Sequence, residues 1–202
     1  SSNHITDDVA PFLTSFLSKN NRIRKIDLSA NDLTNRSMVT FSNPSSINYT
    51  LEELNLSRNP IGGRGINSIG TFLVQNQKIR CLEVNGCLID ANGFIEFCDD
   101  LRRNESLEVL HIQHNPLTDE GIIKLSNAIK ENKFLKEIDL ELVDMMDEGA
   151  YKLFPALLES NIEILSVRNN LIHDGTFIQK SLQNNKKLMK LDIEYNDINY
   201  TL

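Results

Sequence analysis

One short phrase of alternating apolar and polar residues returns seven times along this chain, at an almost constant step. The phrase that runs from Leu51 to Asn59 reads L-E-E-L-N-L-S-R-N. Its copies begin at Ile23, Leu51, Ile79, Leu107, Leu135, Ile162 and Leu188. Successive starts are therefore 28, 28, 28, 28, 27 and 26 residues apart. A period in this range predicts a solenoid, in which each unit buries its apolar face only by packing on its neighbours.

The spacing inside each copy predicts a strand followed by a helix. Positions one, four, six and eleven are apolar, as in Leu107, Leu110, Ile112 and Leu117. The alternation over positions three to seven is the two-residue period of a strand with one buried face. In most copies a glycine follows four residues after position eleven, and apolar residues then recur at the spacing of an amphipathic helix. One unit is expected to be strand, turn and helix.

The phrase resembles the leucine-rich repeat family, and its length is similar to the long-period subfamily typified by ribonuclease inhibitor. This resemblance implies an α/β solenoid shaped as a horseshoe, with a parallel sheet on the concave face and helices on the convex face. We expect a single domain over 1–202, with a helical half-unit at 1–22, an irregular unit at 23–50, regular units at 51–187 and a terminal strand unit at 188–202. No capping motif follows the last phrase, so we expect the natural protein to continue there, or another domain or chain to cover that strand.

Two columns of asparagine are expected to hold the turns together. Position nine is occupied by Asn31, Asn59, Cys87, Asn115, Val143, Asn170 and Asn196. The resemblance implies that an amide here bonds backbone groups inside the coil, where each unpaired group costs ~1 to 3 kcal/mol. Val143 can neither donate nor accept through its side chain, so we expect a local irregularity in the fifth copy. The second column is Asn20, Asn48, Asn76, Asn104, Asn132 and Asn185, expected to close helices in the left-handed conformation that asparagine tolerates.

The exposed strand positions form the candidate functional surface. Equal positions of adjacent copies would lie ~4.8 Å apart on one sheet, with positions three, five, seven and eight on the concave side. Acidic residues predominate there, so we hypothesise that this face receives the basic or mixed-charge surface of a partner protein, with three apolar anchors. The alternative is that these positions are polar only for solubility. The candidate partner-binding residues are Glu53, Glu83, Val109, His111, Glu137, Asp139, Glu141, Ile164, Arg168, Asp192, Glu194 and Tyr195, of which Val109, Ile164 and Tyr195 are the anchors.

No sequence pattern typical of an active site or a cofactor site is present. Glu83, His111 and Asp139 would share one column, but a zinc site needs a better-defined third or fourth ligand, so we expect a salt-linked surface ladder there. The glycine-rich stretch at 62–65 occupies the turn of the repeat itself. We therefore expect no catalytic residue, no metal and no cofactor, and a protein that is not an enzyme.

Composition limits the classes of partner and the cellular compartment that we expect. The net charge is −7, and the Lys and Arg residues are scattered, so we expect no nucleic-acid partner. No apolar run approaches the ~20 residues that cross a bilayer, so we expect no membrane segment. Cys81, Cys87 and Cys98 are odd in number and lack the spacing of secreted proteins, which favours a reducing, cytoplasmic compartment.

Three functions remain open from the sequence. The first is a non-catalytic protein–protein interaction module or scaffold, because the repeats provide a long surface and no active centre. The resemblance implies a second, GTPase activation of the Ran-activator type, since long-period leucine-rich repeat proteins include such activators. It also implies a third, a structural subunit of a cytoskeletal or ciliary assembly, where related repeats occur.

Overall fold

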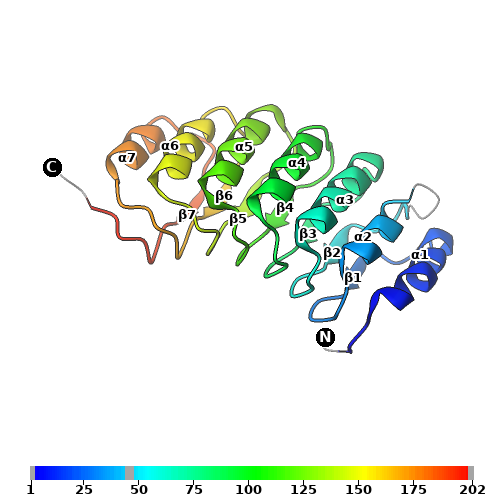
Figure 1. Ribbon diagram of the computed structural model, residues 1–202. Coiled ribbons are helices and arrows are strands. Elements are labelled where there is room, and N and C mark those ends of the chain that lie inside the picture. The colour runs from blue at the N-terminus through cyan, green and yellow to red at the C-terminus, as the bar shows by residue number, and fades with distance from the viewer. Residues whose placement is uncertain (1–2, 44–47, 200–202) are drawn as a thin grey trace.

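Strands and helices alternate along one curved solenoid in the computed structural model of the chain, which describes residues 3–43 and 48–199 (Figure 1). All strands in these ranges belong to one parallel sheet, in chain order from β1 to β7. The strands are β1 Lys25–Asp27, β2 Glu53–Asn55, β3 Cys81–Glu83, β4 Val109–His111, β5 Glu137–Asp139, β6 Ile164–Ser166 and β7 Lys190–Asp192. The helices are η1 Asp7–Val9, α1 Ala10–Lys19, α2 Asn35–Phe41, α3 Gly62–Gln75, α4 Ala91–Leu101, α5 Thr118–Glu131, α6 Asp147–Ala156 and α7 Thr176–Leu182. The predicted parallel sheet and the strand–turn–helix unit are confirmed.

The core is a single layer between the sheet and the row of helices that covers one of its faces (Figure 1). In most strands the middle residue is buried and its two neighbours are half-exposed, as the two-residue period predicts. From the helical side, Phe94 and Phe97 are fully buried, with their ring centroids 5.8 Å apart. The other face of the sheet is left open, and it is the concave face.

Helices α3 and α4 approach closely because glycines meet at their contact. A Cβ on Gly93 would lie 2.2 Å from the Cα of Gly63, which is backbone and cannot rotate away. Gly121, one repeat further on, is less crowded, since its Cβ would lie 3.1 Å from a ring carbon of Phe94. The glycine column of the sequence is therefore a packing requirement whose strength varies from coil to coil.

The position-nine amides form the internal ladder that the resemblance implied. Asn115 is buried, and its Oδ1 accepts the N–H groups of Cys87 and Ile89 in the preceding coil, both at 3.0 Å. Its Nδ2 donates to the carbonyls of Val84 and Ile112 at 2.9 Å. One side chain thus satisfies backbone groups of two coils that water cannot reach.

The substitution of valine at position nine changes two coils rather than the fifth alone. In the fifth coil, Asp144, the residue after Val143, has a φ of 58°. In the fourth coil, the N–H of Leu117 donates to the carbonyl of Asn115 at 2.8 Å. Thr118 has a φ of 56°, and its N–H donates to the carbonyl of Val143 in the fifth coil.

The same rearrangement surrounds Cys87. Ile61 donates to the carbonyl of Asn59, and Gly62, with a φ of 64°, donates to the carbonyl of Cys87. A side chain that lacks an amide at position nine is therefore accommodated by a defined second turn type.

The second asparagine column closes helices by a different mechanism from the one expected. Asn76 and Asn132 follow α3 and α5 with φ of −99° and −67°, and no asparagine of this column has a positive φ. The prediction of a left-handed backbone is therefore wrong for the whole column. The asparagine side chains act instead. Asn132 accepts the N–H of Leu135 at 2.8 Å and donates to the carbonyl of Leu101 at 2.7 Å. An amide that reaches a neighbouring coil makes a left-handed residue unnecessary.

The first coils depart most from the regular unit. Helix α2 is short and begins after Thr34, whose hydroxyl accepts the N–H of Arg36. Ser37 stands in the glycine column and donates to Asp7 at 2.5 Å, which ties the first helical turn to α2. The parts of the predicted irregular and terminal units at 44–47 and 200–202 lie outside the described residues. Within the described ranges, no helix combines the length and the apolar character that a membrane span requires.

Candidate protein-binding surface

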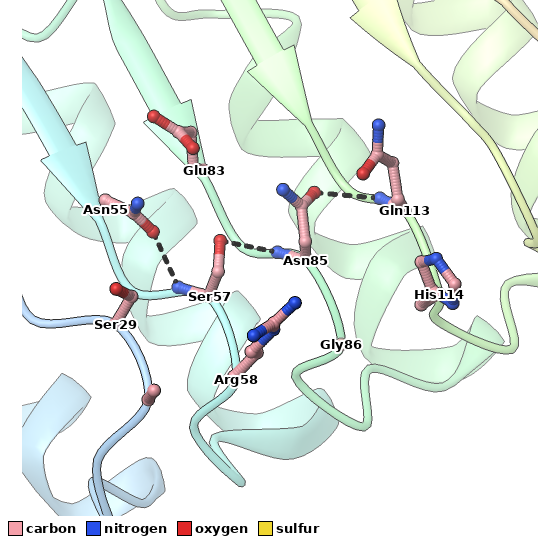
Figure 2. A pocket seen from close by; sticks show the side chains of 10 residues that line it. Ser29, Asn55, Ser57, Arg58, Glu83, Asn85, Gly86, Gln113 and His114 are labelled. Carbon is pink, nitrogen blue, oxygen red and sulfur yellow. Dashed lines mark hydrogen bonds between the residues drawn. The ribbon is translucent and has the colours of Figure 1, made fainter. Parts of the chain in front are cut away.

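The concave face carries two hollows, one over each half of the sheet. The N-terminal hollow has a volume of ≈ 570 Å³ and lies where β1 to β4 end. It is lined by Ser29, Ala30, Asn55, Ser57, Arg58, Glu83, Asn85, Gly86, Gln113 and His114 (Figure 2). The C-terminal hollow has a volume of ≈ 130 Å³ and crosses β5 to β7. It is lined by Glu137, Ile138, Asp139, Glu141, Ile164, Leu165, Ser166, Arg168, Lys190 and Asp192.

The sheet register brings the predicted columns together. Glu83 lies opposite His111, and His111 lies opposite Asp139. The predicted ladder among these three is nevertheless wrong in its contacts, because the Nε2 of His111 bonds Glu137 Oε1 diagonally at 3.0 Å. Asp139 instead accepts a hydrogen bond from the amide of Gln113. Longer side chains on neighbouring strands reach diagonal partners, which a column drawn from sequence spacing does not show.

The C-terminal hollow is organised by Arg168. Its Nε lies 3.8 Å from Glu141 Oε1, its Nη1 lies 3.7 Å from Asp192 Oδ2, and it also pairs with Glu194. Desolvation lowers the pKa of Arg168, but the hydrogen bond and the charge of Glu194 raise it by a larger amount. The pKa of Arg168 therefore lies above its ordinary value. The guanidinium carbon lies 4.2 Å from the ring centroid of Tyr195, a cation–π contact.

The carboxylates beside Arg168 are held in place by local hydrogen bonds. Asp139 Oδ1 accepts the N–H of Glu141 at 3.0 Å, and Asn169 donates to Glu141 at 2.6 Å. Two of the three predicted apolar anchors, Val109 and Ile164, are half-buried on either side of Glu137. The third anchor, Tyr195, is 68% exposed.

At the N-terminal side of the sheet, Glu53 is already neutralised. Its carboxylate lies 2.7 Å from the ammonium of Lys25 on β1. The hydrogen bond and the charge of Glu53 raise the pKa of Lys25. Glu53 lines neither of the two hollows.

Sequence reasoning placed only Glu83 of the N-terminal hollow among the candidate residues. Arg58, Asn85 and His114 were not among them, because the prediction favoured the copies in which acidic side chains predominate. The sequence signal for two of them is their place at position eight, which the spacing assigns to the concave side: Arg58 and His114 both occupy it. In the structure this position has a positive φ in every copy, from Ala30 to Tyr195. This backbone turns the chain at the end of each strand and places position eight at the rim of the face (Figure 2).

The cysteines offer little reactivity. Burial raises the pKa of Cys81 and of Cys87 to about 11, and it raises the pKa of Cys98 well above its ordinary value. A thiol that stays protonated near neutral pH is a poor nucleophile and a poor metal ligand. Across the described ranges, no three His, Cys, Asp or Glu side chains gather as a metal ion would require.

Comparison with known proteins supports the fold. The profile of the Leucine Rich repeat matches residues 48–70, 103–126 and 184–201, each of which contains one strand phrase. A search of curated protein sequences gave no match. Among solved structures, the chain is similar to one described as Leiomodin-1 Actin-Binding Site 2, with 18% identity and a TM-score of 0.56 over 65% of this chain and 76% of that chain. At this identity the likeness shows the fold alone, and the chain is an α/β leucine-rich-repeat solenoid.

Proposed function

We propose that this leucine-rich-repeat chain is a non-catalytic interaction module that binds a basic or mixed-charge partner protein through its concave face. The observation that carries the proposal is the C-terminal hollow, where four carboxylates and two bases gather on an open sheet surface. Fixed charges of one predominant sign favour a surface of the opposite sign and exclude like-charged competitors. The predicted binding residues Glu137, Asp139, Glu141, Ile164, Arg168 and Asp192 all line this hollow.

Preorganisation supports this assignment. Glu137 and Glu141 each have a hydrogen-bond partner in the free protein, so little side-chain entropy remains to be lost on binding. Tyr195 adds an exposed aromatic ring whose orientation is set by Arg168. Aromatic and arginine side chains dominate the energetics of protein interfaces, so this pair is a suitable anchor beside the acidic residues.

The test removes the negative charges of the C-terminal hollow and keeps the size of its side chains. The variant E137Q/D139N/E141Q retains hydrogen-bond acceptors at all three positions, and the control E96Q/E120Q/E148Q removes the same charge from exposed positions on α4, α5 and α6. Both are used as bait in lysate of the producing cell, after circular dichroism has shown that they are folded. We expect the concave variant to lose proteins that the wild type and the control retain. Equal capture by all three would overturn the proposal.

A cytoskeletal scaffold is the second candidate. It is supported by the likeness to the solved structure described as an actin-binding site of leiomodin-1. Purified actin, as monomer and as filament, is therefore the first defined partner to test, by co-sedimentation with the same two variants. GTPase activation of the Ran-activator type has no structural observation in its favour, and a GTP-hydrolysis assay with purified Ran would decide it.

Two further assignments belong to the same proposal. Cys81, Cys87 and Cys98 are all free thiols, which supports a reducing, cytoplasmic compartment. Fractionation of the producing cell would test the compartment.

The presence of a helix in every described coil between consecutive strands supports the long-period, ribonuclease-inhibitor-like subfamily.

The outer edge of the sheet at β7 carries a second interface in this proposal. Leu182, Leu188 and Leu191 line a hollow of ≈ 240 Å³ there, and Met189 beside them is 74% exposed. We propose that a covering domain or chain packs on this edge, because stacked repeats bury apolar residues only against a neighbour. Protection of Met189 from oxidation in a lysate complex, relative to the purified chain, would test it.

A further inference from the structure

In the N-terminal hollow, two asparagine side chains have their acceptor oxygens occupied and their amide donors free. Asn55 Oδ1 accepts the N–H of Ser57 at 2.9 Å, Ser57 Oγ accepts the N–H of Asn85 at 3.1 Å, and Asn85 Oδ1 accepts the N–H of Gln113 at 3.0 Å (Figure 2). Since each oxygen is fixed by a backbone N–H, the amide orientations are fixed as well. The Nδ2 groups of Asn55 and Asn85 donate to no other described residue and remain available to a ligand.

Arg58 adds an available positive charge to these donors. Its side chain is exposed and forms no ion pair or hydrogen bond with any residue of the described ranges. Figure 2 shows it extending over the hollow toward Asn85 and Gly86. His114, also exposed, lies at the same rim two coils beyond Arg58, with the coil of Gly86 between them.

In the C-terminal hollow, the corresponding donors are already paired with carboxylates of the chain itself. Arg168 is engaged by Glu141, Asp192 and Glu194, and the amide of Asn169 is engaged by Glu141. In the N-terminal hollow the only carboxylate in the lining is Glu83, which lies near the strand end, away from the guanidinium of Arg58 (Figure 2). The two halves thus carry opposite recognition chemistry on one continuous sheet.

We propose that the N-terminal hollow binds an acidic, extended peptide segment of the partner protein, with a carboxylate of that segment on Arg58 and His114. The amides of Asn55 and Asn85 donate to the same segment, and Glu83 accepts backbone N–H groups from it. A volume of ≈ 570 Å³ falls within the ~300 to 1,000 Å³ of typical ligand sites. The inference rests on the proposed function and makes the partner mixed in charge, acidic toward β1–β4 and basic toward β5–β7.

The experiment uses defined peptides with the full chain. Uniformly ¹⁵N-labelled protein is titrated with capped hexaglutamate, hexaglutamine and hexalysine peptides at about 0.15 M ionic strength, where unspecific attraction is screened. We expect hexaglutamate alone to shift the amide resonances of Ser57, Arg58, Asn85, Gly86 and His114, although the chain has a net charge of −7.

A matched pair of variants locates the charge that matters. Arg58→Gln removes the charge from the rim, and Arg64→Gln removes an equal charge from an exposed position on α3. We expect Arg58→Gln to weaken hexaglutamate binding about tenfold or more, as for loss of a charge-assisted hydrogen bond, and Arg64→Gln to change it less than about twofold. Well-dispersed spectra of both variants establish that they are folded.

Four results would overturn the inference: no binding of hexaglutamate, shifts located outside the hollow, equal weakening by the two variants, or binding of inorganic phosphate in place of the peptide. The proposed function has an independent outcome. If E137Q/D139N/E141Q still loses the captured partner while hexaglutamate fails to bind, only the assignment of the N-terminal hollow fails.

Discussion

Truncation of the Asn115 side chain is the sharpest test of how this solenoid is held together. Asn115→Ala removes the acceptor of two buried N–H groups, those of Cys87 and Ile89, and the donor to the carbonyls of Val84 and Ile112. An unpaired buried group costs ~1 to 3 kcal/mol, so the two N–H groups alone cost ~2 to 6 kcal/mol. We expect a loss of about 3 to 5 kcal/mol in the free energy of unfolding.

Two measurements check this value. Urea unfolding followed by circular dichroism gives the loss of stability, with Asn127→Ala, at an exposed position of α5, as the matched control. We expect the control to change stability by less than about 0.5 kcal/mol. Amide hydrogen exchange should also show Cys87 and Ile89, in the turn after β3, losing protection before β3 and β4 do. A loss below about 1 kcal/mol for Asn115→Ala would refute the view that the ladder satisfies groups water cannot reach.

Three further predictions follow from particular contacts. Gly93→Ala should cost about 3 kcal/mol or more in denaturant unfolding, because its Cβ meets the backbone of Gly63, whereas Gly121→Ala should cost clearly less, because its Cβ meets a side chain; equal costs would contradict the packing argument. Cys87→Val should cost less than about 1.5 kcal/mol by the same assay, because Val143 is accommodated by the same turn type; a loss as large as that of Asn115→Ala would contradict it. Burial would raise the pKa of Asp7, but hydrogen bonds from Ser37 and Thr34 outweigh burial, and the net pKa is lowered. The contribution of this carboxylate to the free energy of unfolding is therefore complete above pH ~4 and is lost as the pH falls through the lowered pKa. The stability difference between wild type and Asp7→Asn should therefore be largest near neutral pH and shrink in acid, and a difference that grows in acid would contradict this.

The repeat predicted the fold because its constraints are local and periodic. Leu110 and Ile112 are buried by their place in a two-residue alternation, and the parallel register repeats the sequence step. The adjustment around Val143 could not be predicted in detail. Its absent amide is compensated in the preceding coil, by Leu117 and Thr118, through backbone choices that a side-chain pattern does not encode.

The candidate site was predictable as a surface but not as a set of contacts. Spacing placed Glu83, His111 and Asp139 in one column, yet His111 pairs with Glu137 on the diagonal. Spacing also could not show that the acceptors of Asn55 and Asn85 are occupied by backbone N–H groups, which leaves the donors for a ligand. Pairing among side chains depends on reach and on competing partners, and these appear only in three dimensions.

The concave face is the proposed binding surface of this chain. Hydrogen–deuterium exchange of the chain, free and saturated with a captured partner, tests it most directly. We expect new protection at the strand ends and the turns that follow them, from Asn55 through Arg168, and unchanged exchange along the exposed faces of α3 to α6. Protection confined to the helices, with the strand-end turns unchanged, would contradict the account.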